Sequence, residues 1–560
     1  MEKIWLKSYP PEVPAQADIT SYPSLNAMLE SNCARFSSLT AFSNQGAAIT
    51  YRELDALSHA LAAYLQQGAG LVSGERVAIM LPNLLQYPVA LFAALRAGCL
   101  VVNCNPLYTA RELHHQLLDS GAACIIVLEN FAHTLEQALP GSAIRKVITT
   151  RVGDLLHFPR AQLTNFVVEH VKHMVPEWHI DGAVEFSDAL AQGADLHLSQ
   201  VSAGPADVAF LQYTGGTTGV PKAAMLTHGN IVANVQQTAA WVCGSLDEGV
   251  ETAVIPLPLY HVFALTSMLT FLKLGANCVL ITNPRDMPGL IKELKRTRST
   301  VIIGVNTLFN AMLNAQGIAH IDADGLKLVI AGGMAVQRAV AERWQQMFGV
   351  PIIEGYGLTE TSPIVCANPL NISAYTGMIG LPLPSTEVAI MDDAGLPVAP
   401  GDFGEICIRG PQVMKGYWNQ VDETAHVLSA DGWLRSGDMG VMDPRGYVTL
   451  LDRKKDVIVV SGFKVFPNEV EDVVAMHAGV LEVAAIAAAD ERSGEVVKIV
   501  VVRKDGALTA EALVEHCKHY LAAYKVPKYV IFRDQSLPKS TIGKILRRIV
   551  KEEENGTDPR

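Results

Sequence analysis

What this 560-residue sequence lacks first of all is positive charge. It holds 44 Lys and Arg residues against 56 Asp and Glu residues, which gives a formal net charge of −12. Proteins that coat nucleic acid depend on cationic surface to neutralise phosphates. The composition therefore argues against a nucleic-acid partner, and any phosphate that the protein binds should be held locally.

Paired cysteines are also missing. The nine cysteines are odd in number, and no two of them form a Cys-x-x-Cys pair of the kind found in many zinc sites. Most lie in apolar runs, as Cys278 does in Cys-Val-Leu-Ile. We therefore expect buried free thiols in a reducing compartment, in place of disulfides or zinc.

A signal peptide and a membrane span are not apparent either. The first residues lack the apolar core of a signal peptide. The longest apolar-leaning stretch, residues 261–282, is interrupted by Lys273, Gly275 and Asn277, so it predicts a buried helix followed by a strand. These absences favour a cytoplasmic protein. Its length predicts three to four structural units.

Short apolar runs alternate with helical periods through most of the chain. Thr50-Tyr-Arg-Glu53 and Thr109-Ala-Arg-Glu112 are capping boxes that predict helix starts. Continuous Val, Ile and Leu runs predict strands buried on both faces, as in mostly parallel α/β sheets. These runs are residues 76–81, 124–128, 208–213, 254–258, 278–282, 301–305, 326–331 and 351–354.

The pattern changes after Gly377. Short alternating strands with Gly and Pro turns are expected at residues 387–391, 404–409 and 447–451. The charge cluster Asp452-Arg-Lys-Lys-Asp456 follows, and beyond it lies a compact α+β pattern. We predict a large unit of residues 1–451, whose β-rich part is about 377–451, and a small C-terminal unit of residues 452–560.

The strongest local motif is Tyr213-Thr-Gly-Gly-Thr-Thr-Gly-Val-Pro-Lys222, directly after a predicted strand. Glycines allow close backbone approach, so N–H groups, threonine hydroxyls and Lys222 can surround phosphate oxygens. It is not the P-loop of NTPases, because Val220 and Pro221 separate Gly219 from the lysine. A glycine-rich turn without a ligand is the alternative.

Four weaker motifs follow it. Each has a plainer alternative: a tight turn, an Asx turn or a solvated basic face. In Glu354-Gly-Tyr-Gly-Leu-Thr-Glu360, Tyr356 offers a flat face for a purine and Glu360 a carboxylate for Mg²⁺. The others are Asp431-Gly-Trp-Leu-Arg-Ser-Gly-Asp438, the segment from Asp452 to Lys464, and Pro538-Lys-Ser-Thr-Ile-Gly-Lys544 with the basic residues after it.

The order and spacing of these motifs resemble the adenylate-forming superfamily of acyl-CoA synthetases, luciferases and peptide-synthetase adenylation domains. The resemblance runs from Thr50 to Lys544 and is closest to bacterial long-chain fatty-acid–CoA ligases. It implies two mostly parallel α/β-layered sheets, a small distorted β-barrel and a mobile α+β C-terminal domain. It also implies that ATP, Mg²⁺ and CoA act together on a long-chain fatty acid.

The resemblance also implies roles for individual residues. Lys544, Thr359, Glu360 and His261 are the expected catalytic residues, and Thr214 and Glu360 are expected near the metal. Asp452 is the expected hinge, and Leu265, Val305, Gly462 and Lys464 are expected along the acyl and CoA passages. The remaining expected nucleotide contacts are Tyr213, Gly215, Gly216, Thr217, Thr218, Gly219, Lys222, Gly332, Gly333, Met334, Tyr356, Gly357, Asp438 and Arg453.

Substrate choice is less determined than the chemistry. Leu265 stands where some long-chain relatives carry a gating tryptophan, and Ala223 replaces a common glycine. A medium-chain or aryl-acid CoA ligase is the nearest alternative. A luciferase-like oxygenase, a peptide-synthetase module and a non-catalytic nucleotide-binding protein are more distant ones. Peripheral contact with the inner face of the cytoplasmic membrane and a homodimer rest on the resemblance alone, because we find no basic amphipathic anchor in the sequence.

Overall fold

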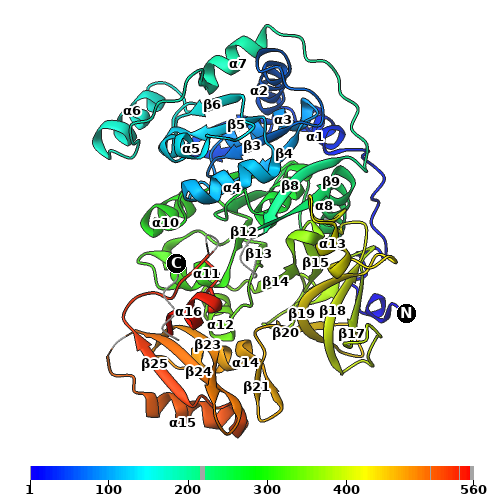
Figure 1. Ribbon diagram of the computed structural model, residues 1–560, viewed down its shortest axis with the longest axis vertical. Coiled ribbons are helices and arrows are strands. Elements are labelled where there is room, and N and C mark those ends of the chain that lie inside the picture. Colours follow the sequence, from blue (N-terminus) through cyan, green and yellow to red (C-terminus); the bar gives the residue numbers. More distant parts are fainter. Residues whose placement is uncertain (1, 215–220, 505, 541–542, 555–560) are drawn as a thin grey trace.

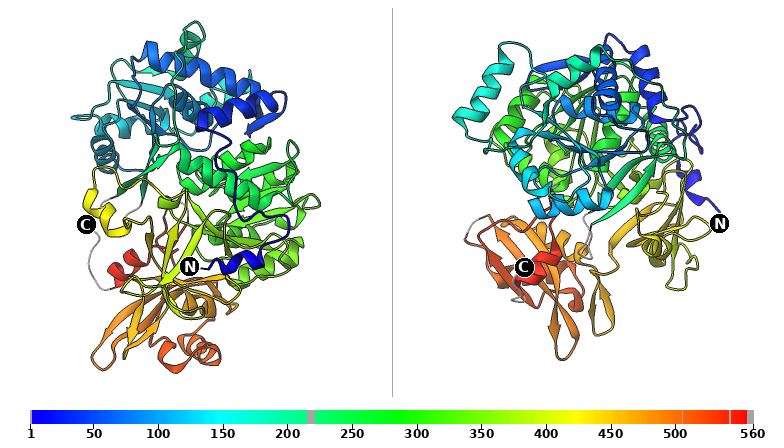
Figure 2. Two further views of the ribbon diagram at one scale, coloured as in Figure 1. Left: turned by 90° about the vertical axis from the view of Figure 1, so that its right-hand side faces the viewer. Right: turned by 45° about the horizontal axis from the view of Figure 1, so that its top comes forward.

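The computed structural model describes residues 2–214, 221–504, 506–540 and 543–554. Two large sheets form the upper part of the molecule, and a small unit in orange and red lies beneath them (Figure 1). Views from other directions show the same division, with the β-rich unit beside the small one (Figure 2). The predicted α/β class with mostly parallel sheets is confirmed.

The first large sheet has seven strands, which pair in parallel except for β8 with β9. Both predicted capping boxes are present, at the starts of α2 and α4. In order across the sheet, the strands are β7 (Val184–Glu185), β6 (Lys146–Thr150), β5 (Cys124–Leu128), β3 (Arg76–Met80), β4 (Leu100–Asn103), β8 (Val208–Thr214) and β9 (Lys222–Thr227).

The second large sheet has nine strands, parallel at its centre and antiparallel at both edges. The strand predicted at 254–258 ends earlier, at Ile255, because Pro256 and Pro258 lack the N–H that a ladder needs. The order is β16 (Leu381–Pro382), β15 (Ile364–Ala367), β14 (Ile352–Gly357), β13 (Leu328–Ala331), β12 (Val301–Gly304), β10 (Thr252–Ile255), β11 (Asn277–Leu280), β1 (Thr40–Asn44) and β2 (Ala47–Thr50).

Helices cover both large sheets, and the main core lies between the sheets. That core joins Ile79 and Val101 of the first sheet to Ile255 and Ile303 of the second. The helices of this part are α1 (Leu25–Arg35), α2 (Tyr51–Ala63), α3 (Gln86–Arg96), α4 (Ala110–Ser120), α5 (Ala132–Ala138), α6 (Arg160–Phe166), α7 (Phe186–Ala194), α8 (His228–Val242), α9 (Val262–Lys273), α10 (Met287–Arg296), α11 (Asn306–Leu313) and α12 (Arg338–Phe348).

Two smaller sheets complete the fold. The β-rich unit is a four-stranded antiparallel sheet, in the order β17 (Glu387–Met391), β18 (Phe403–Arg409), β19 (Leu434–Met442) and β20 (Val448–Arg453), with helix α13 (Val421–Val427) before β19. Strand β20 continues to Arg453. The boundary that we predict after residue 451 therefore falls inside this strand, two residues before its end.

The C-terminal sheet has five strands, of which β25 pairs in parallel with β24. Two contacts tie this unit to the nine-stranded part: Arg338 N donates to Asp472 Oδ1 at 3.1 Å, and Thr307 Oγ1 donates to the Gly543 carbonyl at 3.1 Å. Its elements are β21 (Ile458–Val460), β22 (Phe463–Val465), α14 (Pro467–Ala475), β23 (Val480–Asp490), β24 (Gly494–Arg503), α15 (Ala510–Tyr520), β25 (Tyr529–Arg533) and α16 (Arg547–Glu554).

The cysteines are unpaired thiols, as the sequence predicts. Eight of the nine are buried and Cys243 is exposed. Among the described residues, no helix has the length and apolarity needed to cross a bilayer.

A substitution at Trp344 tests the packing of the second core, which lies on the other face of the nine-stranded sheet. It is fully buried on α12 and packs against Phe309 and Phe348, with ring centroids 4.9 Å and 4.5 Å away. We expect Trp344→Ala to lower the free energy of unfolding by about 3–5 kcal/mol, because it leaves a cavity. The exposed Met347 on the same helix gives the control, and Met347→Ala should change stability by less than about 0.5 kcal/mol in the same urea titration. Equal effects would contradict this packing.

Candidate active site

A buried carboxylate, that of Asp438, is the meeting point of the segments predicted to bind a nucleotide. Asp438 lies in β19 and is 4% exposed. The Tyr356 hydroxyl, at the end of β14, donates to Asp438 Oδ2 at 2.8 Å, and Arg453 Nε lies 3.4 Å from Asp438 Oδ1. Asp438 and Arg453 are register partners in the antiparallel pair β19–β20, which explains why they face each other.

Lys544 joins this cluster from the far end of the chain. Burial, and then the positive charge of Arg453, lower the pKa of Lys544 to about 8, while Asp438 opposes the shift. Burial raises the pKa of Asp438, whereas Arg453, Tyr356 and Lys544 lower it. The structure therefore brings together one carboxylate, one phenol and two cations from the nine-stranded sheet, the β-rich unit and the C-terminal unit.

The turn after β14 presents the predicted Thr359 and Glu360. Gly357 is required here, because a Cβ at this position would lie 1.8 Å from the Pro363 carbonyl oxygen. The turn is closed by Leu358 N, which donates to Thr361 Oγ1 at 3.0 Å, and continues as the short helix η6 (Thr359–Thr361). The Glu360 carboxylate accepts a hydrogen bond from the Tyr417 hydroxyl at 2.6 Å.

The hairpin β8–β9 holds both ends of the predicted phosphate loop. Thr214 and Lys222 are register partners, so the loop leaves and re-enters the sheet at one point. Lys222 pairs with Glu423, and its ammonium lies 5.5 Å from the centroid of the Tyr417 ring. Gly215, Gly216, Thr217, Thr218 and Gly219 lie outside the described residues.

Tyr213 and the loop after β13 are fixed by further hydrogen bonds. The Tyr213 hydroxyl donates to Asp119 Oδ2 at 2.5 Å. Val336 N donates to Glu354 Oε1 at 3.1 Å, which ties the segment after Gly332, Gly333 and Met334 to β14. Burial, and then the charge of Asp472, raise the pKa of Glu354 to about 8.

His261 stands at the N-terminal end of α9, next to Tyr260. Burial lowers the pKa of His261 to about 4, so its ring is neutral at pH 7. A chain of buried amides and a phenol holds this loop. Tyr87 donates to Asn103 Oδ1 at 2.7 Å, Asn103 Nδ2 to Gln212 Oε1 at 3.0 Å, and Gln212 Nε2 to the Tyr260 carbonyl at 2.7 Å.

Sequence reasoning assigned no role to this polar chain or to Tyr417. Asn103 is the last residue of β4, and Gln212 lies near the end of β8. Parallel strands bring the side chains at their carboxyl ends to one edge of the sheet. Their polarity inside otherwise apolar runs was the available signal. Tyr417 lies in a loop without regular spacing, so no pattern pointed to its contacts with Lys222 and Glu360.

The predicted passage residues occupy different environments. Leu265 is fully buried in α9, and Val305 is 3% exposed. Gly462 lies in the exposed turn between β21 and β22 with a φ of 87°, and a Cβ there would meet no described atom within 4 Å. Lys464, two residues further on in β22, is exposed and has its ammonium 4.8 Å from the centroid of the Phe403 ring.

Asp452, the predicted hinge, is buried in a dense network. Its carboxylate accepts hydrogen bonds from Asn468 N at 2.7 Å and from Arg547 Nη1 at 2.7 Å. Arg547 also donates to both oxygens of Glu471, at 2.7 and 2.6 Å. Burial raises the pKa of Glu471 and Arg547 opposes the shift, so this arginine holds two buried carboxylates beside the segment that carries Lys544.

Magnesium would have one carboxylate at the phosphate end of the site. Within residues 2–214, 221–504, 506–540 and 543–554, no group of three or more His, Cys, Asp or Glu side chains is arranged to hold a metal. Mg²⁺ is commonly held by one or two carboxylates together with phosphates of the substrate. Glu360, beside the hairpin β8–β9, fits a metal that arrives with a nucleoside triphosphate.

Two family profiles and several known proteins match this chain. The profile of the AMP-binding enzyme family matches residues 29–418, and that of the AMP-binding enzyme C-terminal domain matches residues 469–544. A long-chain-fatty-acid–CoA ligase of Yersinia pestis is 53% identical over 99% of this chain and 98% of its own. A feruloyl-CoA synthase of Amycolatopsis sp is 34% identical over 91% of this chain and 95% of its own.

The fold agrees with the sequence comparisons. The crystal structure of ATP-bound MatB from Rhodopseudomonas palustris superposes with a TM-score of 0.81 at 26% identity, covering 95% of this chain and 99% of that one. The two family profiles span the hairpin, the turn after β14 and Lys544, whereas Asp438 and Arg453 lie between the two matched ranges. From its sequence and its architecture alike, the chain belongs to the AMP-binding enzyme family.

Proposed function

We propose that this protein activates long-chain fatty acids as CoA thioesters in two steps. The carboxylate of the acid attacks the α-phosphorus of ATP and releases pyrophosphate, which gives an acyl-adenylate. The thiol of CoA then attacks the acyl carbon, and AMP leaves. The observation that carries the proposal is the meeting of Lys544 with Asp438 and Arg453, in a chain that is 53% identical to a long-chain ligase along its length.

Asp438 and Arg453 are the proposed ribose contacts. A carboxylate can accept from both ribose hydroxyls, and Tyr356 keeps one of its oxygens oriented. Tyr356 and Gly357 provide one wall for adenine, and Gly332, Gly333 and Met334 provide another. The bond from Val336 N to Glu354 supports this wall, because it fixes the segment that follows Met334.

The proposed phosphate contacts lie around the hairpin β8–β9. Thr214 and Lys222 flank the loop, whose backbone and hydroxyl donors would surround the β- and γ-phosphates. Thr359 would donate to the α-phosphate. Thr214 and Glu360 would hold Mg²⁺, which supplies positive charge to the phosphates when bound. The pair between Lys222 and Glu423 would have to open for Lys222 to reach a phosphate.

Lys544 is the proposed electrostatic catalyst of the first step. Negative charge builds on the α-phosphate oxygens as the carboxylate oxygen adds, and a fixed cation in a site shielded from water stabilises it. Neutral His261, held by the polar chain behind Tyr260, would border the acyl carboxylate without adding charge.

The second step requires the C-terminal unit to turn. We infer that residues 452–560 rotate about Asp452, which withdraws Lys544 and brings the turn at Gly462 and Lys464 to the acyl-adenylate. The absence of a side chain at Gly462 would leave room for the CoA thiol. Leu265 and Val305 would line the acyl passage, where each buried methylene contributes about 0.8 kcal/mol.

An aryl-acid CoA ligase is the second candidate, because a feruloyl-CoA synthase is also similar along most of the chain. Its identity of 34% is well below the 53% of the long-chain ligase, which favours the aliphatic substrate. A panel of C6 to C18 acids and ferulate, compared by kcat/KM for AMP release, decides between them. A higher kcat/KM for ferulate than for every fatty acid would overturn the long-chain assignment.

The proposed location follows from the same substrate. Long-chain acids partition into lipid, so we propose a cytoplasmic enzyme that contacts the inner face of the membrane peripherally. A homodimer remains a proposal that rests on the resemblance to related ligases.

Lys544→Ala tests the first step. We expect fatty-acid-dependent ATP–pyrophosphate exchange to fall by about 10²–10³-fold, because the developing charge loses its cation. Conversion of preformed acyl-AMP and CoA to thioester should stay within a few-fold of the wild type. The exposed Lys551 on α16 gives the control, and Lys551→Ala should leave both half-reactions unchanged. Equal loss of both half-reactions in a folded Lys544→Ala protein would refute the assignment.

Gly462→Leu tests the second step and should have the opposite effect. Adenylation should persist, whereas thioester formation from preformed acyl-AMP should drop at least tenfold, because the side chain would obstruct the thiol. Gly494 is a matched control: its φ is 76° and a Cβ there also meets no described atom within 4 Å. If Gly494→Leu impaired the thioester step as strongly, backbone strain and not obstruction would explain the loss.

The pH dependence of adenylation tests the state of Lys544. With a pKa of about 8, its amine is protonated below that pH and loses its charge above it. The adenylation rate should therefore fall as the pH rises through 8. Lys544→Arg should be slower but should lack this alkaline fall, because a guanidinium stays charged. An unchanged alkaline limb in Lys544→Arg would assign the titration to another group.

A further inference from the structure

One helical projection of the molecule carries large apolar side chains that nothing in the described chain covers. Helix α6 (Arg160–Phe166) continues as η4 (Val167–Val171), and neither contains a buried residue. In Figure 1 this segment stands out from the side of the seven-stranded unit, and the tilted view in Figure 2 shows it projecting likewise. We call residues 158–174 the projecting segment.

We call the exposed apolar side chains of the projecting segment the apolar stripe. Leu163 and Phe166 lie three residues apart on α6, Val171 ends η4, Met174 follows the helix, and Phe158 stands two residues before it. These five side chains are between 53% and 82% exposed. Soluble proteins rarely leave so many large apolar groups together in water unless the surface binds something.

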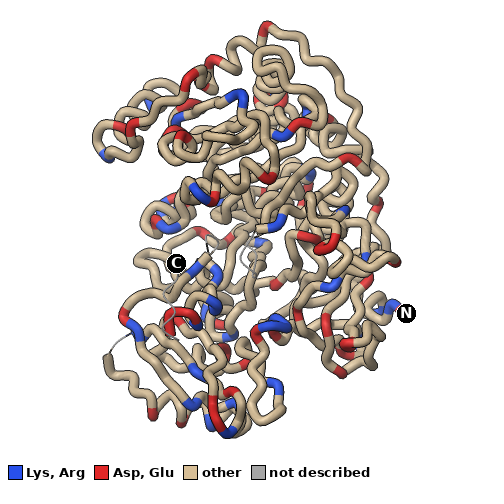
Figure 3. The backbone as a smooth tube through the Cα atoms, in the orientation of Figure 1, with Lys and Arg blue, Asp and Glu red and all other residues tan. Residues whose placement is uncertain are grey.

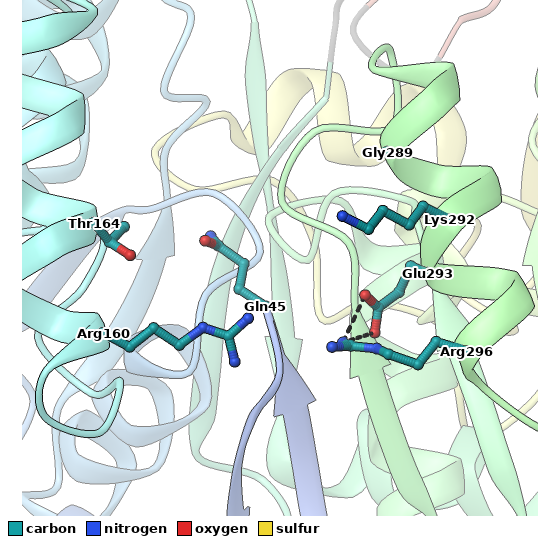
Figure 4. Close-up of a pocket in the computed structure, with 7 residues that line it drawn as sticks. All are labelled: Gln45, Arg160, Thr164, Gly289, Lys292, Glu293 and Arg296. Carbon is teal, nitrogen blue, oxygen red and sulfur yellow. Dashed lines mark hydrogen bonds and ion pairs between the residues drawn. The ribbon is translucent and has the colours of Figure 1, made fainter.

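A cationic pocket lies beside the stripe. Arg160 and Thr164 of α6 face Lys292 and Arg296 of α10 across Gln45, around a cavity of about 260 Å³ (Figure 4). The glycine at position 46 lets both arginines lie close to the backbone, because a Cβ there would lie 2.5 Å from Arg160 Nη1 and 2.9 Å from Arg296 Nη1. Its φ of 75° also favours glycine.

Two of these cations have no acidic partner in the described part of the chain. Arg296 is paired with Glu293, but no ion pair includes Arg160 or Lys292. Lys172 adds a further cation at the end of η4. Figure 3 shows acidic and basic residues spread over the whole molecule, whose formal net charge is −12. Unpaired cations beside an apolar stripe are therefore a local exception.

We propose that the projecting segment and the cationic pocket dock the protein on an anionic phospholipid membrane. The apolar stripe would enter the boundary between headgroups and acyl chains, as interfacial helices do. Arg160 and Lys292 would attract lipid phosphates, and a guanidinium can bind phosphate through two parallel hydrogen bonds. A convex helix suits a flat lipid surface better than it suits a groove. This inference rests on the proposed function, because the fatty-acid substrate resides in lipid.

Flotation of the full-length protein with vesicles tests the docking surface. We expect at least tenfold more protein to bind vesicles of 70% phosphatidylcholine and 30% phosphatidylglycerol than vesicles of phosphatidylcholine alone, at 50 mM salt, with the difference shrinking as salt is raised. Leu163→Ser with Phe166→Ser should lower binding at least tenfold. Arg160→Gln with Lys292→Gln should abolish the preference for phosphatidylglycerol. Wild-type protein that stays unbound in every vesicle preparation would overturn the proposal.

Two controls separate this surface from exposure in general. Val250 and Leu396 are 65% and 63% exposed elsewhere, so Val250→Ser with Leu396→Ser should leave vesicle binding within twofold of the wild type. Leu163→Trp should show a blue shift of fluorescence when anionic vesicles are added, whereas Leu396→Trp should not. This gain of signal does not depend on the serine variants being folded. No shift at position 163, or equal shifts at both positions, would overturn the proposal.

Other occupants of the surface give distinct results. If sedimentation without vesicles showed a dimer that Leu163→Ser with Phe166→Ser dissociates, and vesicle binding were unaffected, the surface would bind a second copy and the proposal would be wrong. AMP release with decanoate in solution should be unchanged in all these variants. Its absence in the wild type would refute the proposed function, while vesicle binding would still report on docking.

Discussion

The site depends on how a buried carboxylate is stabilised. Asp438 is almost entirely removed from water, which disfavours its ionised form, and it is surrounded by groups that favour that form. These groups come from three parts of the chain: a phenol from β14, a guanidinium from the adjacent strand and an ammonium from the C-terminal unit. The fold must hold all three parts in place for the charges to balance. The positions of β14, β19 and the C-terminal unit are thus linked through one side chain.

The same balance makes the contact with Lys544 conditional. Arg453 repels this lysine and Asp438 attracts it, so the lysine is held only while the C-terminal unit lies against the large one. Two hydrogen bonds join this unit to the nine-stranded part, one from Thr307 to Gly543 and one from Arg338 to Asp472, and both are partly exposed to water. By contrast, two hydrophobic cores lie within the C-terminal unit and Arg547 binds Glu471 there, while Asp452, at the end of β20, is the point where the two units join. The unit is therefore more strongly organised internally than it is attached, which favours its movement as one body.

Much of this architecture follows from local patterns in the sequence. Capping boxes and continuous apolar runs have direct physical causes, so α2, α4 and most parallel strands could be predicted. Strand ends were less accurate where proline removed ladder hydrogen bonds, as after Ile255. The motifs identified Tyr356, Asp438 and Lys544, but their meeting depends on the packing of separate units. The chain of Tyr87, Asn103 and Gln212 joins helix α3 to two neighbouring strands that are far apart in the sequence, and no spacing along the sequence encodes it. The projecting segment could not be predicted as a docking surface from the sequence, because few basic residues accompany its apolar stripe. The neighbouring cations come from α10, which is distant in the sequence.

The buried thiols described for the fold bear on the chemistry of an enzyme that generates mixed anhydrides. Burial raises the pKa of Cys33 and Cys99 to about 12, so these side chains hold almost no thiolate at neutral pH. Only thiolates attack activated acyl groups quickly. The eight buried thiols therefore do not compete with an incoming thiol for the acyl group, and Cys243 is the one exposed cysteine. Burial thus protects these eight cysteines from acylation by the enzyme's own intermediate.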